Sequence, residues 1–102
     1  MSQYFAVFAT DKPEQGQVRE RVRAAHRQYL RNPSPHFVVV RLGGPTLECA
    51  SGKMNGTLLV VEANSVEEVQ AFLADDPYMR AGIFEQVVVR PWSWGLGNPE
   101  LS

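Results

Sequence analysis

The hydrophobic residues fall into four short apolar runs, separated by two stretches with helical spacing. The runs cover residues 4–9, 36–42, 57–62 and 84–89, and their length and composition predict β-strands. Between the first two runs, apolar residues recur at spacings of four, three and four: Val18, Val22, Ala25 and Tyr29. This spacing predicts a helix over residues 15–30, with His26 about 70° from the centre of the apolar stripe, at the border of the buried face.

A second helix is predicted after the third run. Ser65 and Glu68 form a capping box at its start, and its core positions are Val66, Val69, Phe72 and Leu73. Asp76 and Pro77 then end this helix and start a short helical turn, with Asp76 as N-cap and Pro77 at the first helical position. Gly82 ends the turn. The pattern therefore places a carboxylate at a rigid corner, beside the aromatic Tyr78 and close to the last strand.

The order of predicted elements is βαββαβ. Gly43, Gly44 and Pro45 are predicted to break the second strand, residues 46–56 to form a loop or irregular edge, and residues 92–102 to form a tail. No linker is long enough to divide the chain, so residues 1–102 are predicted to be one domain. Two helices on one face of a four-stranded antiparallel sheet give an α+β, ferredoxin-like fold.

The predicted strands are apolar on both faces. In the first strand, Phe5, Val7 and Ala9 alternate with residues that are also apolar or aromatic, and the other strands behave alike. A sheet with one solvated face alternates apolar and polar residues, and two helices cover only one face. A second copy of the chain would cover the other, which predicts a homodimer through the sheet face. The alternative is that some of these residues reflect β-propensity alone.

Composition and charge narrow the classes of partner. Hydrophobic residues make up 44% of the chain and charged residues 21%, as in globular proteins. A net charge of −1 gives no attraction to nucleic acid or to an anionic membrane. The single cysteine, Cys49, forms no internal disulfide, and no signal peptide or membrane span is recognisable. We therefore expect a soluble cytoplasmic protein without nucleic-acid or membrane partners.

Few residues of the chain carry the types of side chain that catalysis needs. There is no phosphate-binding glycine loop, nucleophile elbow or metal-ligand spacing, so no cofactor or metal is expected. Five arginines of the first helix are expected to spread over its solvated arc: Arg19, Arg21, Arg23, Arg27 and Arg31.

The remaining candidates are His26, Asp76, Tyr78 and, more weakly, His36 and Glu85. A carboxylate bonded to one nitrogen of a histidine fixes the tautomer of the ring and favours proton exchange at the other nitrogen. Taken alone, the pattern favours structural roles for these residues: a border histidine, a helix cap and a core tyrosine.

At these residues the sequence resembles the YciI-like family of small proteins. The resemblance covers residues 4–92 and rests most specifically on the block Asp76–Gly82 followed by Val88–Trp92. An Arg-x-x-His element, Arg23 to His26, and the Gly-Gly-Pro at residues 43–45 support it. The family differs from this chain at Asn32–His36, where relatives usually continue the first helix into a glycine-containing turn.

The resemblance implies a ferredoxin-like fold of the dimeric α+β barrel group. It also implies an active site that pairs His26 with Asp76. Tyr78 and Arg23, which stand in the matching motifs, are our predicted substrate-binding residues. The function that follows is a small cofactor-independent enzyme, an isomerase or lyase, which uses this His-Asp dyad for acid/base chemistry on a small cyclic or aromatic metabolite. The alternative is a non-catalytic small-ligand-binding or accessory module, in which His26 and Asp76 form a structural hydrogen bond.

Overall fold

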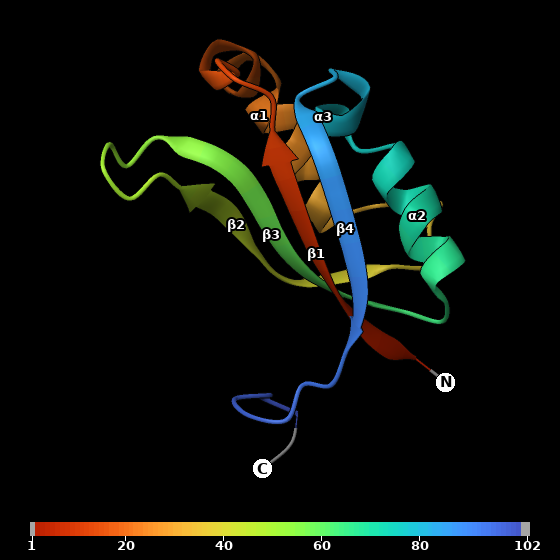
Figure 1. The fold of residues 1–102 in the computed structure, drawn as a ribbon. Helices are drawn as coiled ribbons and strands as arrows, with labels where there is room; N and C mark the ends of the chain where they lie inside the picture. Colours follow the sequence, from red (N-terminus) through yellow and green to blue (C-terminus); the bar gives the residue numbers. More distant parts are fainter. Residues whose placement is uncertain (1, 101–102) are drawn as a thin grey trace.

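The computed structural model describes residues 2–100 of the chain, and its elements follow the predicted order (Figure 1). The elements are β1 (Gln3–Asp11), α1 (Gly16–Arg31), β2 (Val39–Leu47), β3 (Met54–Ala63), α2 (Val66–Ala74), α3 (Pro77–Arg80) and β4 (Phe84–Trp92). The four strands form one antiparallel sheet in the order β2-β3-β1-β4. The predicted ferredoxin-like α+β fold is confirmed. The tail predicted for residues 92–102 is described as far as residue 100.

The core lies between the sheet and the helices (Figure 1). Alternate residues of β1 point into it because successive side chains of a strand face opposite sides: Phe5 and Val7 are each 1% exposed. Val69, Phe72 and Leu73 of α2 pack against them, as the spacing of the second helix predicts. The predicted capping box is also present in part, because Ser65 Oγ accepts a hydrogen bond from the Glu68 backbone N–H at 3.2 Å.

The predicted break in the second strand is wrong. β2 begins at Val39, not His36, and continues through Gly43, Gly44 and Pro45 to Leu47. β2 is an edge strand, where a proline's missing N–H costs no sheet hydrogen bond if it faces away from the neighbour. Gly43 allows close packing, since a Cβ there would lie 2.8 Å from Leu59 Cδ2. Much of the predicted loop at 46–56 is therefore a long β2–β3 hairpin.

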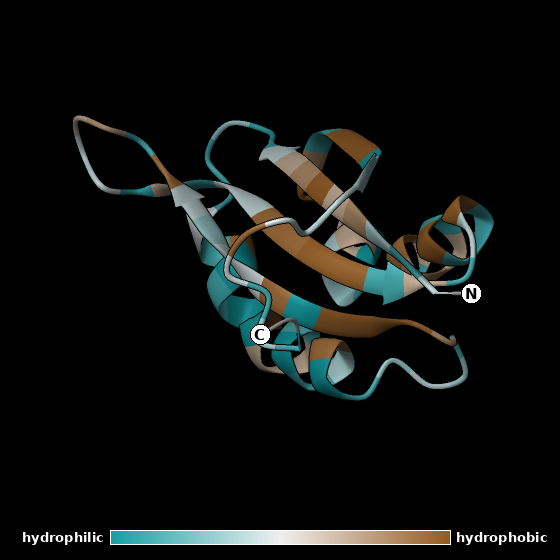
Figure 2. Cartoon of the chain, turned by 90° about the horizontal axis from the view of Figure 1, so that it is seen from below, coloured by the Kyte–Doolittle hydropathy of each residue, from teal (hydrophilic) through white to brown (hydrophobic). Residues whose placement is uncertain are grey.

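Apolar residues run along the strands (Figure 2), and some of them are exposed on the outer face of the sheet, as the two-sided strand pattern predicts. Phe8 of β1 is 50% exposed and lies directly opposite Leu58 of β3 and Val88 of β4. Beyond β4, Trp94 packs edge-on against Tyr4, with ring centroids 5.5 Å apart. The segment after β4 therefore covers one end of this face and leaves Phe8 and Leu58 uncovered. Among residues 2–100, no helix combines the length and the apolar character needed to cross a membrane.

Candidate functional site

The His26 imidazole and the Asp76 carboxylate are in direct contact. His26 Nδ1 lies 2.7 Å from Asp76 Oδ1, so the contact predicted between these residues is present. Both side chains are buried: His26 is 6% exposed and Asp76 is 1% exposed. The predicted border position of His26 is therefore wrong. The most buried residues of α1 are Arg19 and His26, whereas three residues of the predicted apolar stripe are half-buried and Ala25 is exposed.

Asp76 is both a helix cap and the partner of the histidine. Its Oδ1 accepts a hydrogen bond from the Tyr78 backbone N–H at 3.0 Å, which caps α3, and Pro77 occupies the first helical turn. The Asp76 backbone N–H donates to the Leu73 carbonyl oxygen at 3.1 Å, which fixes the corner between α2 and α3. The two roles that the sequence left open for Asp76 therefore coexist.

Tyr78 packs against the face of the His26 ring. The rings of Tyr78 and His26 are stacked, with centroids 3.7 Å apart and planes 7° from parallel. Phe84 of β4 packs edge-on against Tyr78, at 6.2 Å between centroids. Tyr78 is itself 3% exposed. The imidazole is thus fixed in orientation by a hydrogen bond at its edge and by a ring on its face.

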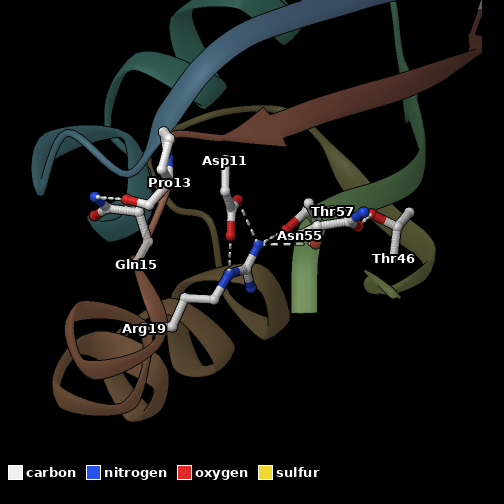
Figure 3. Close-up of polar contacts among 8 residues, drawn as sticks. Asp11, Pro13, Gln15, Arg19, Thr46, Asn55 and Thr57 are labelled. Carbon is white, nitrogen blue, oxygen red and sulfur yellow. Dashed lines mark hydrogen bonds and ion pairs between the residues drawn. The ribbon is translucent and has the colours of Figure 1, made fainter. Parts of the chain in front are cut away.

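Arg19 is part of the same buried cluster, although it was predicted to lie on the solvated arc. Its guanidinium binds both oxygens of Asp11, with Nε–Oδ2 at 2.6 Å and Nη2–Oδ1 at 2.9 Å (Figure 3). Nη2 also donates to Thr57 Oγ1 at 2.9 Å and to the Gly56 carbonyl oxygen at 2.8 Å. Arg19 Cζ lies 4.9 Å from the centroid of the Tyr78 ring, within cation–π range.

The charge of Arg19 is stabilised by these partners. Burial lowers the pKa of Arg19, but the hydrogen bond and the negative charge of Asp11 outweigh it and raise that pKa above its ordinary value. The sequence contains one indication that Arg19 lies on the same side of the helix as His26. Arg19 and His26 are seven residues apart, which is close to two helical turns and places them on one face.

A cavity of about 160 Å³ opens beside the dyad. Its lining comes from α1, from the β2–β3 hairpin and from α3: Arg19, Arg23, His26, Arg27, Leu30, Gly43, Gly44, Pro45, Met54, Thr57, Leu59 and Tyr78. An ionised carboxylate only accepts hydrogen bonds, so Nδ1 of His26 donates to Asp76 and Nε2 is the nitrogen left for a ligand. The cavity therefore brings together a positioned imidazole, a stacked phenol ring and arginine side chains.

Comparison with known proteins places the chain in a family. The model of the YCII-related domain matches residues 3–93. The chain belongs to the YCII-related family. Among curated proteins, Protein YciI of Escherichia coli O6:H1 is 28% identical over 92 residues, covering 86% of this chain and 94% of the relative. An uncharacterized protein of Haemophilus influenzae is 24% identical over 93 residues, covering 87% of this chain and 95% of its own.

Solved structures extend the comparison of this YCII-related domain. The 5-chloro-2-hydroxyhydroquinone dehydrochlorinase of Burkholderia phenoliruptrix is 35% identical, with a TM-score of 0.77, covering 88% of this chain and 93% of that one. That enzyme was solved in complex with 2,5-dihydroxybenzoquinone. A dimeric protein of unknown function and ferredoxin-like fold from Bacteroides fragilis is 13% identical, with a TM-score of 0.54, covering 91% and 96% of the two chains. At that identity the likeness concerns the fold alone.

The two weaker candidates lie outside the His26 cavity of this YCII-related domain. His36 Nε2 lies 2.7 Å from Asp75 Oδ2, and Asp75 Oδ1 lies 2.6 Å from Arg80 Nη2. Glu85 is exposed and lines a separate cavity near the start of α1. The consecutive residues Asp75 and Asp76 thus each bind a different histidine.

Tyr29 is influenced by the aspartates of both histidine–aspartate pairs. Its hydroxyl donates to the Phe72 carbonyl oxygen at 2.6 Å. Burial and the negative charges of Asp75 and Asp76 raise the pKa of Tyr29 to about 12, so it stays protonated as a hydrogen-bond donor. Within residues 2–100, no group of three histidine, cysteine or acidic side chains is placed to hold a metal ion.

Proposed function

We propose that this YCII-related protein is a small cofactor-independent enzyme that transfers protons on a cyclic or aromatic metabolite. His26 is the general acid/base, and Asp76 positions it. The observation that carries the proposal is that His26 binds Asp76 through Nδ1 while the same ring lines a cavity. A histidine whose tautomer is fixed in this way presents one nitrogen that can accept and return a proton near neutral pH.

The proposed chemistry needs no electron acceptor. Nε2 of His26 takes a proton from a ring carbon or hydroxyl of the substrate, and the electrons of the broken bond form a new double bond. In an isomerisation, the imidazolium returns the proton to a different atom. In an elimination, the leaving group departs with its bonding electrons as an anion. Asp76 stabilises the imidazolium between the two steps.

The other lining residues suit a planar ligand that gains negative charge. Tyr78 and Leu59 offer flat or apolar surface, and Arg23 places a half-buried cation in the cavity wall. A cavity of roughly 150 Å³ is large enough for a benzene ring. The similarity to a dehydrochlorinase that was solved with a dihydroxybenzoquinone supports a single-ring oxygenated substrate. Arg23 is then the residue that binds a developing enolate or phenolate oxygen.

We also propose that the chain is a homodimer in the cytoplasm, formed through the outer face of the sheet. Phe8 and Leu58 are adjacent and retain 50% and 37% exposure, respectively, on a face that the helices do not cover. Contiguous apolar surface of this kind marks an interaction site. A second copy of the same face is the simplest complementary surface, because a two-fold interface uses one patch twice.

The test uses 2,5-dihydroxybenzoquinone as a probe, because its ring protons exchange with solvent through protonation and deprotonation at carbon. We expect the wild-type protein to accelerate exchange of these protons in D₂O, followed by proton NMR. His26→Gln should lower the accelerated rate by about 10²- to 10⁴-fold, the usual contribution of a general acid/base. The matched control is His36→Gln, which removes a histidine that also binds an aspartate but lies outside the cavity, and it should leave the rate unchanged.

Two results would contradict the proposal. Binding of the probe without accelerated exchange would favour the alternative of a non-catalytic ligand-binding module. Equal loss of rate in His26→Gln and His36→Gln would assign the effect to the fold and not to the dyad. Both variants are compared only after thermal unfolding shows that they are folded at the assay temperature.

A further inference from the structure

Arginines spaced four residues apart form a row along α1 that follows two adjoining cavities. Arg23, Arg27 and Arg31 are neighbours on one helix face because residues four apart lie one above the other. Arg23 and Arg27 line the His26 cavity. Arg27 and Arg31 line a second, outer cavity of about 500 Å³ between α1 and β2. Arg27, Leu30 and Gly43 line both cavities, so the two adjoin along the helix.

The charges of this row are not neutralised within the described part of the chain. Arg19, Arg41 and Arg80 each bind a carboxylate. No ion pair joins Arg23, Arg27 or Arg31 to a carboxylate within residues 2–100. Like charges four residues apart on a helix destabilise it. The row therefore concentrates positive charge beside the cavities of a chain whose net charge is only −1, and a bound anion would relieve the repulsion.

The rest of the lining of the outer cavity is largely apolar. Leu30, Val38 and Val40 contribute to it, and Pro33 adds a rigid ring from the segment between α1 and β2. Arg41, at its rim, is already bound to Glu62 and Glu100. The outer cavity thus combines a hydrocarbon surface with two guanidinium groups, Arg27 and Arg31, that pair with no carboxylate of residues 2–100.

We propose that the ligand of the His26 site is an aromatic or cyclic carboxylic acid. Its ring lies beside His26 and Tyr78, and its acidic arm lies in the outer cavity, where Arg27 and Arg31 bind the carboxylate. This assignment rests on the proposed function and specifies its substrate class. A guanidinium matches a carboxylate with two parallel N–H donors, which makes arginine the suited residue for this contact.

The geometry of α1 sets the length and the charge of the arm. His26 and Arg31 are five residues apart, which is about 7.5 Å along the helix axis. The long Arg31 side chain covers part of that distance, so an arm of two or three carbons on the ring is enough to bring a carboxylate within its reach. Arg31 lies in the last turn of α1, where the carbonyl ends of the helix carry partial negative charge. That charge favours a singly charged carboxylate over a doubly charged phosphate.

The experiment compares two probes in the full-length protein by calorimetry: 3-(2,5-dihydroxyphenyl)propionate and its methyl ester. We expect the wild type to bind the acid at least tenfold more tightly than the ester at low salt. Arg31→Gln should reduce this ratio, and Arg27→Gln/Arg31→Gln should bring it close to one. Arg21→Gln is the control and should keep the wild-type affinity ratio, because Arg21 is exposed and lines neither cavity. The ratio is taken within each variant. Partial unfolding would weaken the binding of both probes equally and would leave the ratio unchanged.

Three outcomes would overturn the assignment. The first is equal or absent binding of acid and ester in the wild type. The second is a ratio that Arg27→Gln/Arg31→Gln leaves unchanged. The third is tighter binding of 2-phenylethyl phosphate than of 3-phenylpropionate. Failure of the acid/base function is a separate result, because it appears as missing proton exchange with 2,5-dihydroxybenzoquinone, a probe without a carboxylate arm.

Discussion

The imidazole of His26 and the phenol ring of Tyr78 lie almost parallel, with their centroids 3.7 Å apart. The stack joins α1 to α3, and the two stacked residues are 52 positions apart in sequence. The same short α3 presents Asp76 to the edge of the imidazole. One turn of helix therefore fixes both the orientation and the hydrogen-bonding partner of the histidine.

Removal of the Tyr78 ring should destabilise the protein and loosen the site. Tyr78→Ala is expected to lower the free energy of unfolding by about 3–5 kcal/mol, as for other buried aromatic residues. Tyr78→Phe keeps the stacking surface and should cost much less. Chemical denaturation of the two variants measures the difference. Equal losses would mean that the hydroxyl, and not the stacked ring, stabilises this corner.

Arg19 and Asp11 should behave as a buried ion pair. Their side chains are 2% and 5% exposed, so Arg19→Met leaves an uncompensated carboxylate in the core and should cost about 3–5 kcal/mol. The double variant Arg19→Met/Asp11→Leu should recover much of that loss, while Arg21→Met on the exposed side of α1 should be close to neutral. A double-mutant cycle by urea unfolding measures the coupling. Additive losses would contradict the pairing.

The His36–Asp75 contact should contribute to stability in a pH-dependent way. Hydrogen bonds from His36 and then from Arg80 hold the pKa of Asp75 below its ordinary value. A carboxyl whose pKa is lowered by folding stabilises the protein above its ordinary pKa, about 3.9, and this contribution is lost as the pH falls through the folded pKa. The unfolding free energies of wild type and Asp75→Asn should therefore converge below about pH 4. A difference that stays constant between pH 2 and 5 would contradict this.

The dimer proposed through the sheet face should depend on Phe8 and Leu58. Either Phe8→Glu or Leu58→Glu would bury a charge at the interface, so light scattering should give the mass of one chain for each variant and about twice 11.4 kDa for the wild type. Leu96→Glu is the matched control, because Leu96 is 92% exposed and lies outside the strands. A wild-type monomer at micromolar concentration would rule out this interface.

The fold could be predicted because local patterns agree with it at almost every element. Four apolar runs, the capping Ser65 and the Asp76–Pro77 corner each predict a structure that the chain adopts. The predicted second strand ends too early, because Gly43–Pro45 taken alone is a turn signal. The pairing with β3 and the close packing on Leu59 override that signal, and neither contact is visible in the local sequence.

The site could be predicted only in part. The contact between His26 and Asp76 followed from the family motif and the adjacency of helices in this fold. Arg19 was missed because an arginine on a polar helix is usually solvated. Its burial depends on Asp11, eight residues away, and on Thr57, thirty-eight residues away, and such distant partners are set by the tertiary fold. The arginine row was missed because only the cavities show which face of α1 it occupies.

The central question for the proposed mechanism is whether His26 and Asp76 act as one catalytic unit. The rate of ring-proton exchange of 2,5-dihydroxybenzoquinone in D₂O is measured for wild type, His26→Gln, Asp76→Asn and the double variant. Asp76 Oδ1 accepts both the capping hydrogen bond of α3 and the hydrogen bond of His26, and asparagine offers the same oxygen without the negative charge. Asp76→Asn therefore tests whether the carboxylate charge stabilises the imidazolium while the cap is kept. We predict that each single variant loses most of the acceleration, and that the double variant is within a few-fold of the slower single variant. If the losses multiply in the double variant, or if the Asp76→Asn protein catalyses exchange at the wild-type rate, then His26 and Asp76 do not act as one catalytic unit.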